Sequence, residues 1–415
     1  MIDLLIRNAN IRAHSAPVDI AIEEGKILNC DNNLDLFTRQ EINVEGCLVI
    51  PGFVDPHVHL DIILMNSGDL LGRQEPFENS NAIVEKRRMD FTGDDIKRRA
   101  KKALQMASRH GVTAVRAQCH VDTVVGLKHL HALQEVKEEY AGRVSVQIVA
   151  FPQQGLFRNP GTVDLFHAAF QAGADVMGGA SNLDNRVEEH IDLALDLAME
   201  HDVDLDIHAD LGLAKDVNLD DLEVAYIAKK VIERGYEGRV TVGHACTLGS
   251  APPEVAEPAI ALMKEAQLNV VSQPDLYRLG RDDSHNVRRG LTKVKELLDA
   301  GVNVTYASNN IRDAFRPMGN FDPLEEALIL SYGAHMDTVD QFNTLLRMST
   351  YNGARALGLK NYGLEKGCDA DLVVLNAQTP VEAIIGQVEK KFVLKSGSLM
   401  YANANRGSFM LGQSG

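Results

Sequence analysis

The stretch "VIPGFVDPHVHLD" (residues 49–61) runs from a hydrophobic strand directly into two histidines and two acidic residues. His57 and His59 are two positions apart, so in an extended backbone both side chains point to the same side. A metal ion shared by two imidazoles requires this placement. An H-x-H pair by itself is weak evidence for a metal, so its meaning depends on the rest of the chain.

The middle of the chain predicts an α/β fold of the (β/α)8 type, a TIM barrel. Helix-compatible stretches with apolar residues at helical spacing, such as "DDIKRRAKKALQMASRHG" and "VEEHIDLALDLAMEHD", separate eight apolar strand candidates. These candidates lie at 48–54, 113–118, 145–150, 174–178, 204–208, 239–243, 268–272 and 302–307. An open, doubly wound sheet is the competing topology, but no G-x-G-x-x-G motif follows the first strand. We expect the barrel to occupy residues 51–359.

The two ends of the chain predict one small β-domain. Short strand-like pieces occur near the start, as in "DLLIRNANI" and "DIAIEEGKIL", and again near the end, as in "ADLVVLNA" and "KKFVLKSG". Short β-pieces are not stable alone, so we expect them to pair with one another. The predicted domain consists of residues 1–50 plus 360–405.

Composition excludes several classes of partner. The net charge of −16 opposes binding to a phosphate backbone, and no basic run with interleaved aromatic residues occurs. No apolar run approaches the ~20 residues that a membrane helix needs. The five cysteines are scattered singly, and the N-terminus lacks the features of a secretory signal. We therefore expect no nucleic-acid partner, no membrane partner and a cytoplasmic location.

Polar residues collect where the predicted strands end, which is where barrel enzymes carry their reacting groups. His208 ends the fifth strand in "VDLDIH", His244 ends the sixth in "RVTVGH", and Asn309 and Asn310 follow the eighth in "VNVTYAS". Combined with the H-x-H pair, these positions predict a metal site at the barrel rim. His120, at the end of the second strand in "RAQCHVD", is expected to line the same pocket.

Several segments resemble the amidohydrolase superfamily, and the resemblance spans nearly the whole chain. They are "PGFVDPHVHLD", "DIHAD", "GHACT" and "GCDADLVVL". Within that superfamily, "QIVAFPQQGLF", "LTKVKELLDAGVNV", "NNIRDAFRPMGN" and "YNGARALGLKNYGLEKG" are similar to the cytosine deaminase branch. The resemblance implies a TIM barrel with a small β-sandwich built from both termini, one catalytic divalent metal (Zn or Fe), and a homo-oligomer.

The resemblance also implies roles for individual residues. His57, His59 and His208 would be metal ligands, and His244 would orient the attacking water or the leaving group. Gln153 in "FPQQG" would hydrogen-bond the substrate ring. We also expect substrate contacts from Asn310 and His120. The implied activity is hydrolysis of a C–N bond in a small nitrogen heterocycle, such as a pyrimidine or s-triazine, with cyclic amide hydrolysis as the alternative. Loops 61–92 and 273–290 are expected to choose the substrate.

The chain departs from the family pattern at two positions. Asn309 stands where the family has an aspartate that touches the metal and accepts a proton, and Leu211 replaces a second expected carboxylate. An amide can coordinate weakly through oxygen but cannot act as a base. Three explanations remain open. Asn309 is an engineered replacement that traps substrate, or other acids act, or the protein binds a heterocycle without turning it over. The candidate acids are Asp210, which we favour as catalytic, Asp61 and Asp313.

Overall fold

The computed structural model of the protein describes residues 1–12, 14–66, 77–214, 216–273, 276, 290–402 and 410–411. Residues 67–76, 274–275 and 277–289, in the two loops predicted to choose the substrate, lie outside this set, as do residue 13 and residues 403–405 of the predicted β-domain. Among the described residues, no helix has both the length and the apolar character needed to cross a bilayer. The cytoplasmic location stays a prediction.

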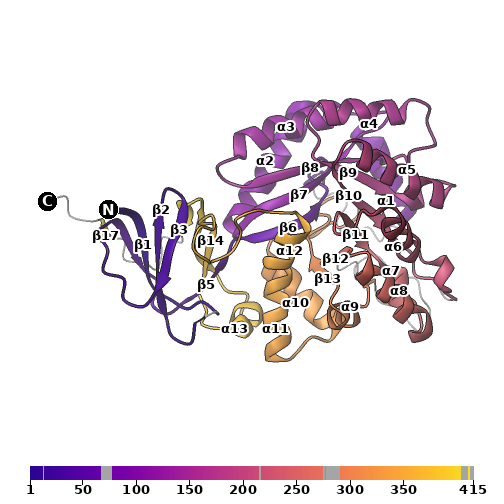
Figure 1. Ribbon diagram of the computed structural model, residues 1–415. Helices are drawn as coiled ribbons and strands as arrows, with labels where there is room; N and C mark the ends of the chain where they lie inside the picture. The colour runs from indigo at the N-terminus through magenta and orange to yellow at the C-terminus, as the bar shows by residue number, and fades with distance from the viewer. Residues whose placement is uncertain are drawn as a thin grey trace.

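Eight parallel strands form the centre of the molecule (Figure 1). In sheet order they are β13 (Asn303–Tyr306), β12 (Asn269–Ser272), β11 (Val240–His244), β10 (Asp204–Ala209), β9 (Val176–Ala180), β8 (Ser145–Phe151), β7 (Val112–His120) and β6 (Phe53–Val58). A parallel bridge between Val58 and Asn309 joins the end of β6 to the chain that follows β13. The prediction of a (β/α)8 barrel is confirmed.

Helices surround this sheet in the alternating order expected of such a barrel. They are α1 (Phe77–Arg88), α2 (Gly93–Arg109), α3 (Lys128–Tyr140), α4 (Thr162–Gln171), α5 (Val187–Glu200), α6 (Glu223–Arg234), α7 (Cys246–Ser250), α8 (Pro253–Glu265), α9 (Val294–Ala300), α10 (Pro323–Ala334), α11 (Val339–Met348), α12 (Tyr351–Ala356) and α13 (Pro380–Ile385), with 3-10 turns at Ser181–Leu183 and Leu219–Asp221. Helix α2 illustrates why such a segment forms a helix and packs against the sheet. Thr92 caps its first turn, and its apolar face, including Ile96 and Leu104, is buried.

The predicted first strand is in fact two strands. Residues Leu48–Pro51 form β5, which belongs to a separate sheet, and the barrel strand β6 begins at Phe53. Gly52 lies between them, and a Cβ on it would overlap the Thr113 side chain. Only glycine allows the backbone to pass this close to β7, so the transition between the two sheets depends on it. The barrel strand therefore extends past His57 to Val58.

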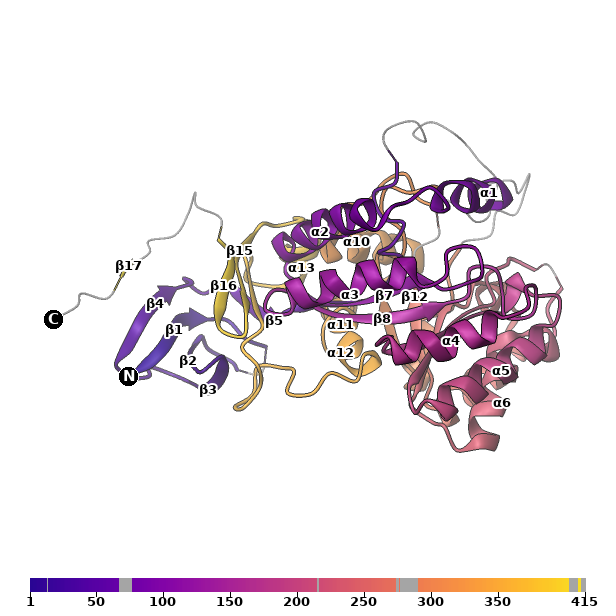
Figure 2. The same cartoon turned by 90° about the horizontal axis from the view of Figure 1, so that it is seen from above.

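Two small sheets pack together beside the barrel (Figures 1 and 2). One contains β17 (Met410–Leu411), β4 (Thr38–Asn43), β1 (Ile2–Ala9), β2 (Val18–Glu23) and β3 (Lys26–Asp31), and the other contains β16 (Ser398–Ala402), β15 (Lys390–Lys395), β14 (Leu372–Leu375) and β5. A shared apolar core includes Ile6 and Ile20 from the first sheet and Leu372 and Phe392 from the second. The predicted sandwich built from both termini is confirmed, while the exact domain boundaries remain a prediction.

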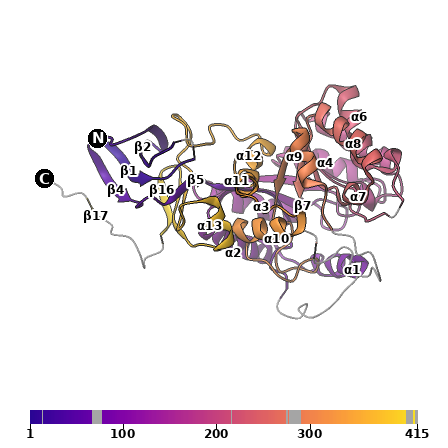
Figure 3. The ribbon, with the colours of Figure 1, turned by 90° about the horizontal axis from the view of Figure 1, so that it is seen from below.

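Helix α13 lies between the small sandwich and the barrel, beside the barrel helix α10 (Figures 1 and 3). Asp322, which caps α10, forms an ion pair with Lys390 at the start of β15, with both carboxylate oxygens 2.6 Å from Nζ. This pair is buried. It therefore connects the barrel helix to the sandwich strand directly.

Candidate metal centre

Three histidines meet at the carboxyl end of the barrel strands. His57 is the second-last residue of β6, His59 follows the end of that strand, and His208 lies near the end of β10. The Nε2 atom of His208 is 3.1 Å from Nε2 of His57 and 3.3 Å from Nε2 of His59. All three side chains are buried. Strands far apart in the sequence thus direct three ring nitrogens toward one point.

The spacing of these nitrogens fits one divalent ion. Zinc binds histidine nitrogen at about 2.0–2.1 Å in tetrahedral geometry, which separates neighbouring ligands by roughly 3.3 Å. Burial, followed by the effect of the neighbouring His57, lowers the pKa of His59 well below its ordinary value. His59 is therefore neutral near pH 7, as a metal ligand must be. The residues present fit the metal that the sequence predicts.

A polar layer beneath this centre orients His57. Nδ1 of His57 lies 3.3 Å from Oδ1 of Asp206 and 3.2 Å from Nε2 of Gln118. Arg116 lies 3.2 Å from the other oxygen of Asp206. Burial alone would raise the pKa of Asp206, but the contacts with His57 and Arg116 hold it below its usual range. An ionised Asp206 accepts the Nδ1 proton of His57, which leaves Nε2 free to bind metal.

Asn309 lies beside the three histidines because its backbone closes the barrel. Its N–H donates to the His57 carbonyl at 2.9 Å, and its carbonyl accepts from the His59 N–H at 2.9 Å. Its φ of +55° is in the left-handed region, which asparagine and aspartate tolerate better than most residues. Its buried Oδ1 has no hydrogen-bond partner among the described residues. An amide oxygen is therefore available at the position predicted for the fourth ligand.

His244 is a fourth histidine beside the three that meet at this centre. It ends β11, and its ring centroid is 5.1 Å from that of His208 and 6.1 Å from that of His57. Its φ of +73° is unusual for a residue with a side chain, and such strain is concentrated at functional sites. The backbone turn at His244 and Ala245 directs the chain from the strand into α7.

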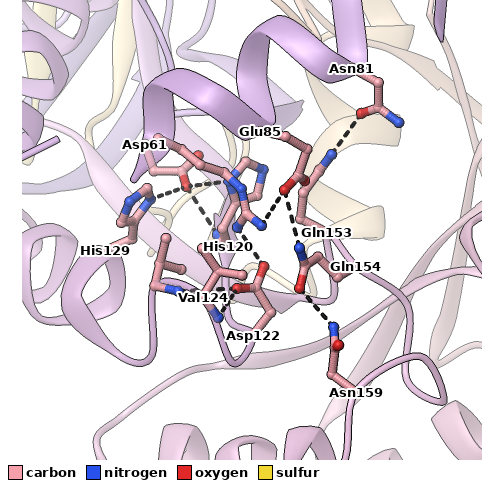
Figure 4. Close-up of polar contacts among 12 residues, drawn as sticks. Asp61, Asn81, Glu85, His120, Asp122, Val124, His129, Gln153, Gln154 and Asn159 are labelled. Carbon is pink, nitrogen blue, oxygen red and sulfur yellow. Dashed lines mark hydrogen bonds and ion pairs between the residues drawn. The ribbon is translucent and has the colours of Figure 1, made fainter. Parts of the chain in front are cut away.

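A cavity of about 410 Å³, including its open mouth, lies over this centre. Its described lining combines imidazoles, neutral amides and apolar side chains, with no Asp, Glu, Lys or Arg among them. These lining residues are His59, Asn81, Phe151, Gln153, Ala180, Asn182, Leu183, His208, Leu211, His244, Asn309, Asn310 and Phe315. Gln153 donates to Oδ1 of Asn81 at 2.8 Å (Figure 4). Gln153 and Asn310, for which the sequence predicts substrate contacts, both line this cavity.

The predicted acids do not line this cavity. Asp210 turns away from it, and its two carboxylate oxygens accept the N–H groups of Glu223 and Val224 at 3.0 and 3.1 Å. Both oxygens are therefore used to cap the N-terminus of α6. Burial and the neighbouring Glu223 carboxylate raise the pKa of Asp210. Asp313 accepts from Nδ2 of Asn310 at 2.7 Å, and so orients a lining residue without lining the cavity itself.

His120 and Asp61 also lie outside the described lining of the cavity. His120 is fully buried, with its ring centroid 6.4 Å from that of His59, and burial lowers its pKa to about 4. Asp61 accepts from the His120 N–H at 3.0 Å and lies 2.7 Å from Nδ1 of His129. The sequence predicts that His120 lines the cavity, but the structure does not place it there. The end of β7 that carries His120 lies against the loop after β6, where Asp61 accepts its N–H.

Sequence reasoning missed the polar layer and part of the cavity lining. Arg116, Gln118 and His120 occupy alternate positions of β7, and Asp206 and His208 occupy alternate positions of β10. Because alternate residues share a face of a strand, this spacing of polar residues in apolar strands was the available signal. Asn81 and Asn182, which line the cavity, follow no such pattern.

The geometry agrees with comparisons to known proteins. The profile of the family described as "Amidohydrolase family" matches residues 77–384. This chain belongs to the amidohydrolase family. It is 35% identical to N-isopropylammelide isopropyl amidohydrolase of Pseudomonas sp. (strain ADP), over 96% of this chain and 97% of that protein. Amidohydrolases of this family are metal-dependent hydrolases, as the sequence predicts.

Two deaminases are also similar to this chain. Pterin deaminase of Rhizobium rhizogenes is 28% identical, over 85% of this chain and 80% of that protein. The crystal structure of 5-methylcytosine deaminase from Klebsiella pneumoniae, liganded with 5-fluorocytosine, superposes with a TM-score of 0.89. That protein is 31% identical, and the match covers 97% of this chain and 98% of the other.

Proposed function

We propose that this amidohydrolase removes ammonia or an alkylamine from a ring carbon of a small neutral nitrogen heterocycle, such as a pyrimidine or an s-triazine. The observation that carries the proposal is the meeting of three histidine nitrogens at ligand spacing beneath a cavity lined by amides. The relatives named above act on heterocycles of this class, as their names state.

The cofactor in this proposal is one catalytic divalent ion, zinc or iron, held by His57, His59 and His208 with the Asn309 oxygen beside them. When bound there, such an ion would supply the polarisation that prepares a water for attack on the ring carbon. Asn309 cannot accept the proton of that water, because an amide is not a base at neutral pH. His244 lines the cavity beside His208, so in this proposal it accepts the proton and returns it to the departing nitrogen.

The amide groups supply recognition in this proposal. Gln153 and Asn81 form a hydrogen-bonded pair, and each amide still has capacity to donate to or accept from a ring edge. Phe151, Leu183 and Phe315 provide the apolar surface against which a flat ring packs. A lining without charged side chains, in the part that the structure describes, favours an uncharged ring over an ionic substrate.

The test is turnover by protein loaded with zinc or iron. The panel contains cytosine, 5-methylcytosine, N-isopropylammelide and pterin, and the products are measured as ammonia, isopropylamine and the hydroxylated ring. We expect turnover of at least one compound, and loss of both the catalytic ion and turnover in His208→Gln.

Three other results would each contradict the proposal. A ring-opened acid would indicate cyclic amide hydrolysis. Thermal stabilisation by a heterocycle without turnover would indicate a binding protein. Turnover that survives complete metal removal would reject the metal-dependent route.

A further inference from the structure

A second buried cluster of metal-ligating side chains lies behind the catalytic centre. Asp61 follows β6, His120 ends β7, and His129 lies in the first turn of α3. Each offers one ligand atom, and these atoms lie within 4.8 Å of one another. All three side chains are fully buried. Figure 4 shows His129 and His120 on either side of the Asp61 carboxylate.

Several polar atoms in this cluster have no hydrogen-bond partner among the described residues. They are Oδ1 of Asp61, Nε2 of His129 and both ring nitrogens of His120. Buried polar atoms in folded proteins are nearly always paired, and Nδ1 of His120 is the one of these four atoms that an ion shared with Asp61 and His129 would satisfy. Imidazole and carboxylate are the groups that zinc and similar first-row ions prefer.

The charges around the cluster also favour a cation. Asp61 and Asp122 are both fully buried carboxylates. The guanidinium of Arg88 binds Asp122 through NH1, and its NH2 lies 2.7 Å from Glu85. One buried arginine is thus already shared by two other carboxylates. A charged carboxylate such as Asp61 is costly to bury without a compensating positive charge.

We propose that Asp61, His120 and His129 bind a second divalent cation, distinct from the catalytic one. Oδ2 of Asp61 is 3.3 Å from Nδ1 of His120, which equals the roughly 3.3 Å expected between ligands of one tetrahedral zinc ion. The 2.7 Å between Oδ2 of Asp61 and Nδ1 of His129 lengthens by about half an ångström when both bind the ion. The ion ties the loop after β6 to β7 and α3.

The competing arrangement is an Asp61–His129 hydrogen bond that holds no metal. Counting ions separates the two arrangements. Protein produced with excess zinc is passed through a desalting column, and its zinc per chain is measured by mass spectrometry. We expect two ions in the wild type and one in His129→Asn, because the asparagine NH2 still donates to Asp61 while its amide oxygen is too weak a ligand to replace the imidazole.

Two controls locate the ions. His167, Glu200 and His201 form a partly exposed cluster elsewhere that could also collect zinc. His201→Ala disrupts it, and that variant should still contain two ions. His208→Gln should contain one ion, held at the second site. With cobalt in place of zinc, the wild type should show two sets of d–d absorption bands and His129→Asn only one.

One ion per chain in the wild type under zinc excess would overturn this proposal, as would two ions in His129→Asn. The ion count tests the second site independently of the proposed function. A protein that holds two ions but turns over no heterocycle refutes the function alone, and an active protein with one ion refutes the second site alone.

Discussion

Asn309 combines a backbone that closes the barrel with a side chain that cannot take a proton. Both of its backbone groups bond to the H-x-H segment, so the position of its side chain beside the metal centre does not depend on its chemical type. Aspartate has nearly the same shape and also tolerates a positive φ. The residue can therefore be changed in charge with little change in geometry.

We expect Asn309→Asp to raise kcat about 10²-fold at equal metal content, because a carboxylate there can accept the proton of the attacking water. The measurement is kcat for the best substrate of the panel, with zinc counted in both proteins. Asn309→Ala is the control, and it should not gain activity. An unchanged kcat in Asn309→Asp would mean that proton transfer to His244 does not limit turnover in the wild type.

Asp206 affects metal binding by orienting the ligand His57. Removing its charge should weaken zinc binding about 10- to 100-fold, the usual cost of losing a carboxylate that orients a histidine ligand. The test is the zinc dissociation constant of Asp206→Asn, measured by competition with a chelator. Thr241→Val is the matched control, since Thr241 contacts Arg116 at 3.2 Å but is not among the His57 partners described above. Equal affinity in Asp206→Asn and wild type would refute the orienting role.

At the scale of elements, the capping of α10 links the barrel to the sandwich. Asp322 accepts from the Leu324 N–H at 3.0 Å, lies 3.0 Å from Nδ1 of His110 after α2, and pairs with Lys390 on β15. Burial alone would raise the pKa of Asp322, but the contacts with His110 and Lys390 hold it below its ordinary value.

Asp322→Asn isolates this charge, because asparagine is also a good helix cap. Leaving Lys390 buried without its partner should lower the free energy of unfolding by about 3 kcal/mol at pH 7. A carboxyl whose folded pKa is depressed stabilises the protein above its unfolded pKa of about 3.9 and loses that effect in more acid solution. The deficit of the variant should therefore shrink below pH 4. Urea titrations at pH 7 and below pH 4 measure it, and a deficit that does not change would contradict the assignment.

For the whole molecule, the metal centre joins strands from opposite sides of the barrel. An ion that binds only the folded chain stabilises it by about 4 kcal/mol when the free ion is 1,000 times its dissociation constant. Chelation should therefore lower the thermal midpoint, and added zinc should restore it. His208→Gln should respond less than the wild type. A wild-type midpoint that chelation leaves unchanged would argue against a bound ion.

Much of the architecture could be predicted from the sequence because it depends on local periodicity. Strand ends, amphipathic helices and the spacing of His57 and His59 follow from which faces of each element are apolar. The division at Gly52 could not be predicted in this way, because an unbroken apolar run looks the same whether it belongs to one sheet or to two.

The sequence by itself determined the barrel, the pairing of the two ends and the histidines that converge on one centre. Only the tertiary structure decided that Asp210 caps α6, that Asp206 orients His57, and that Asp61 joins His120 and His129 in a second cluster. These contacts depend on which strands are neighbours and on how each loop turns after its strand. Such arrangements arise only when the barrel closes, so no local pattern of residues predicts them.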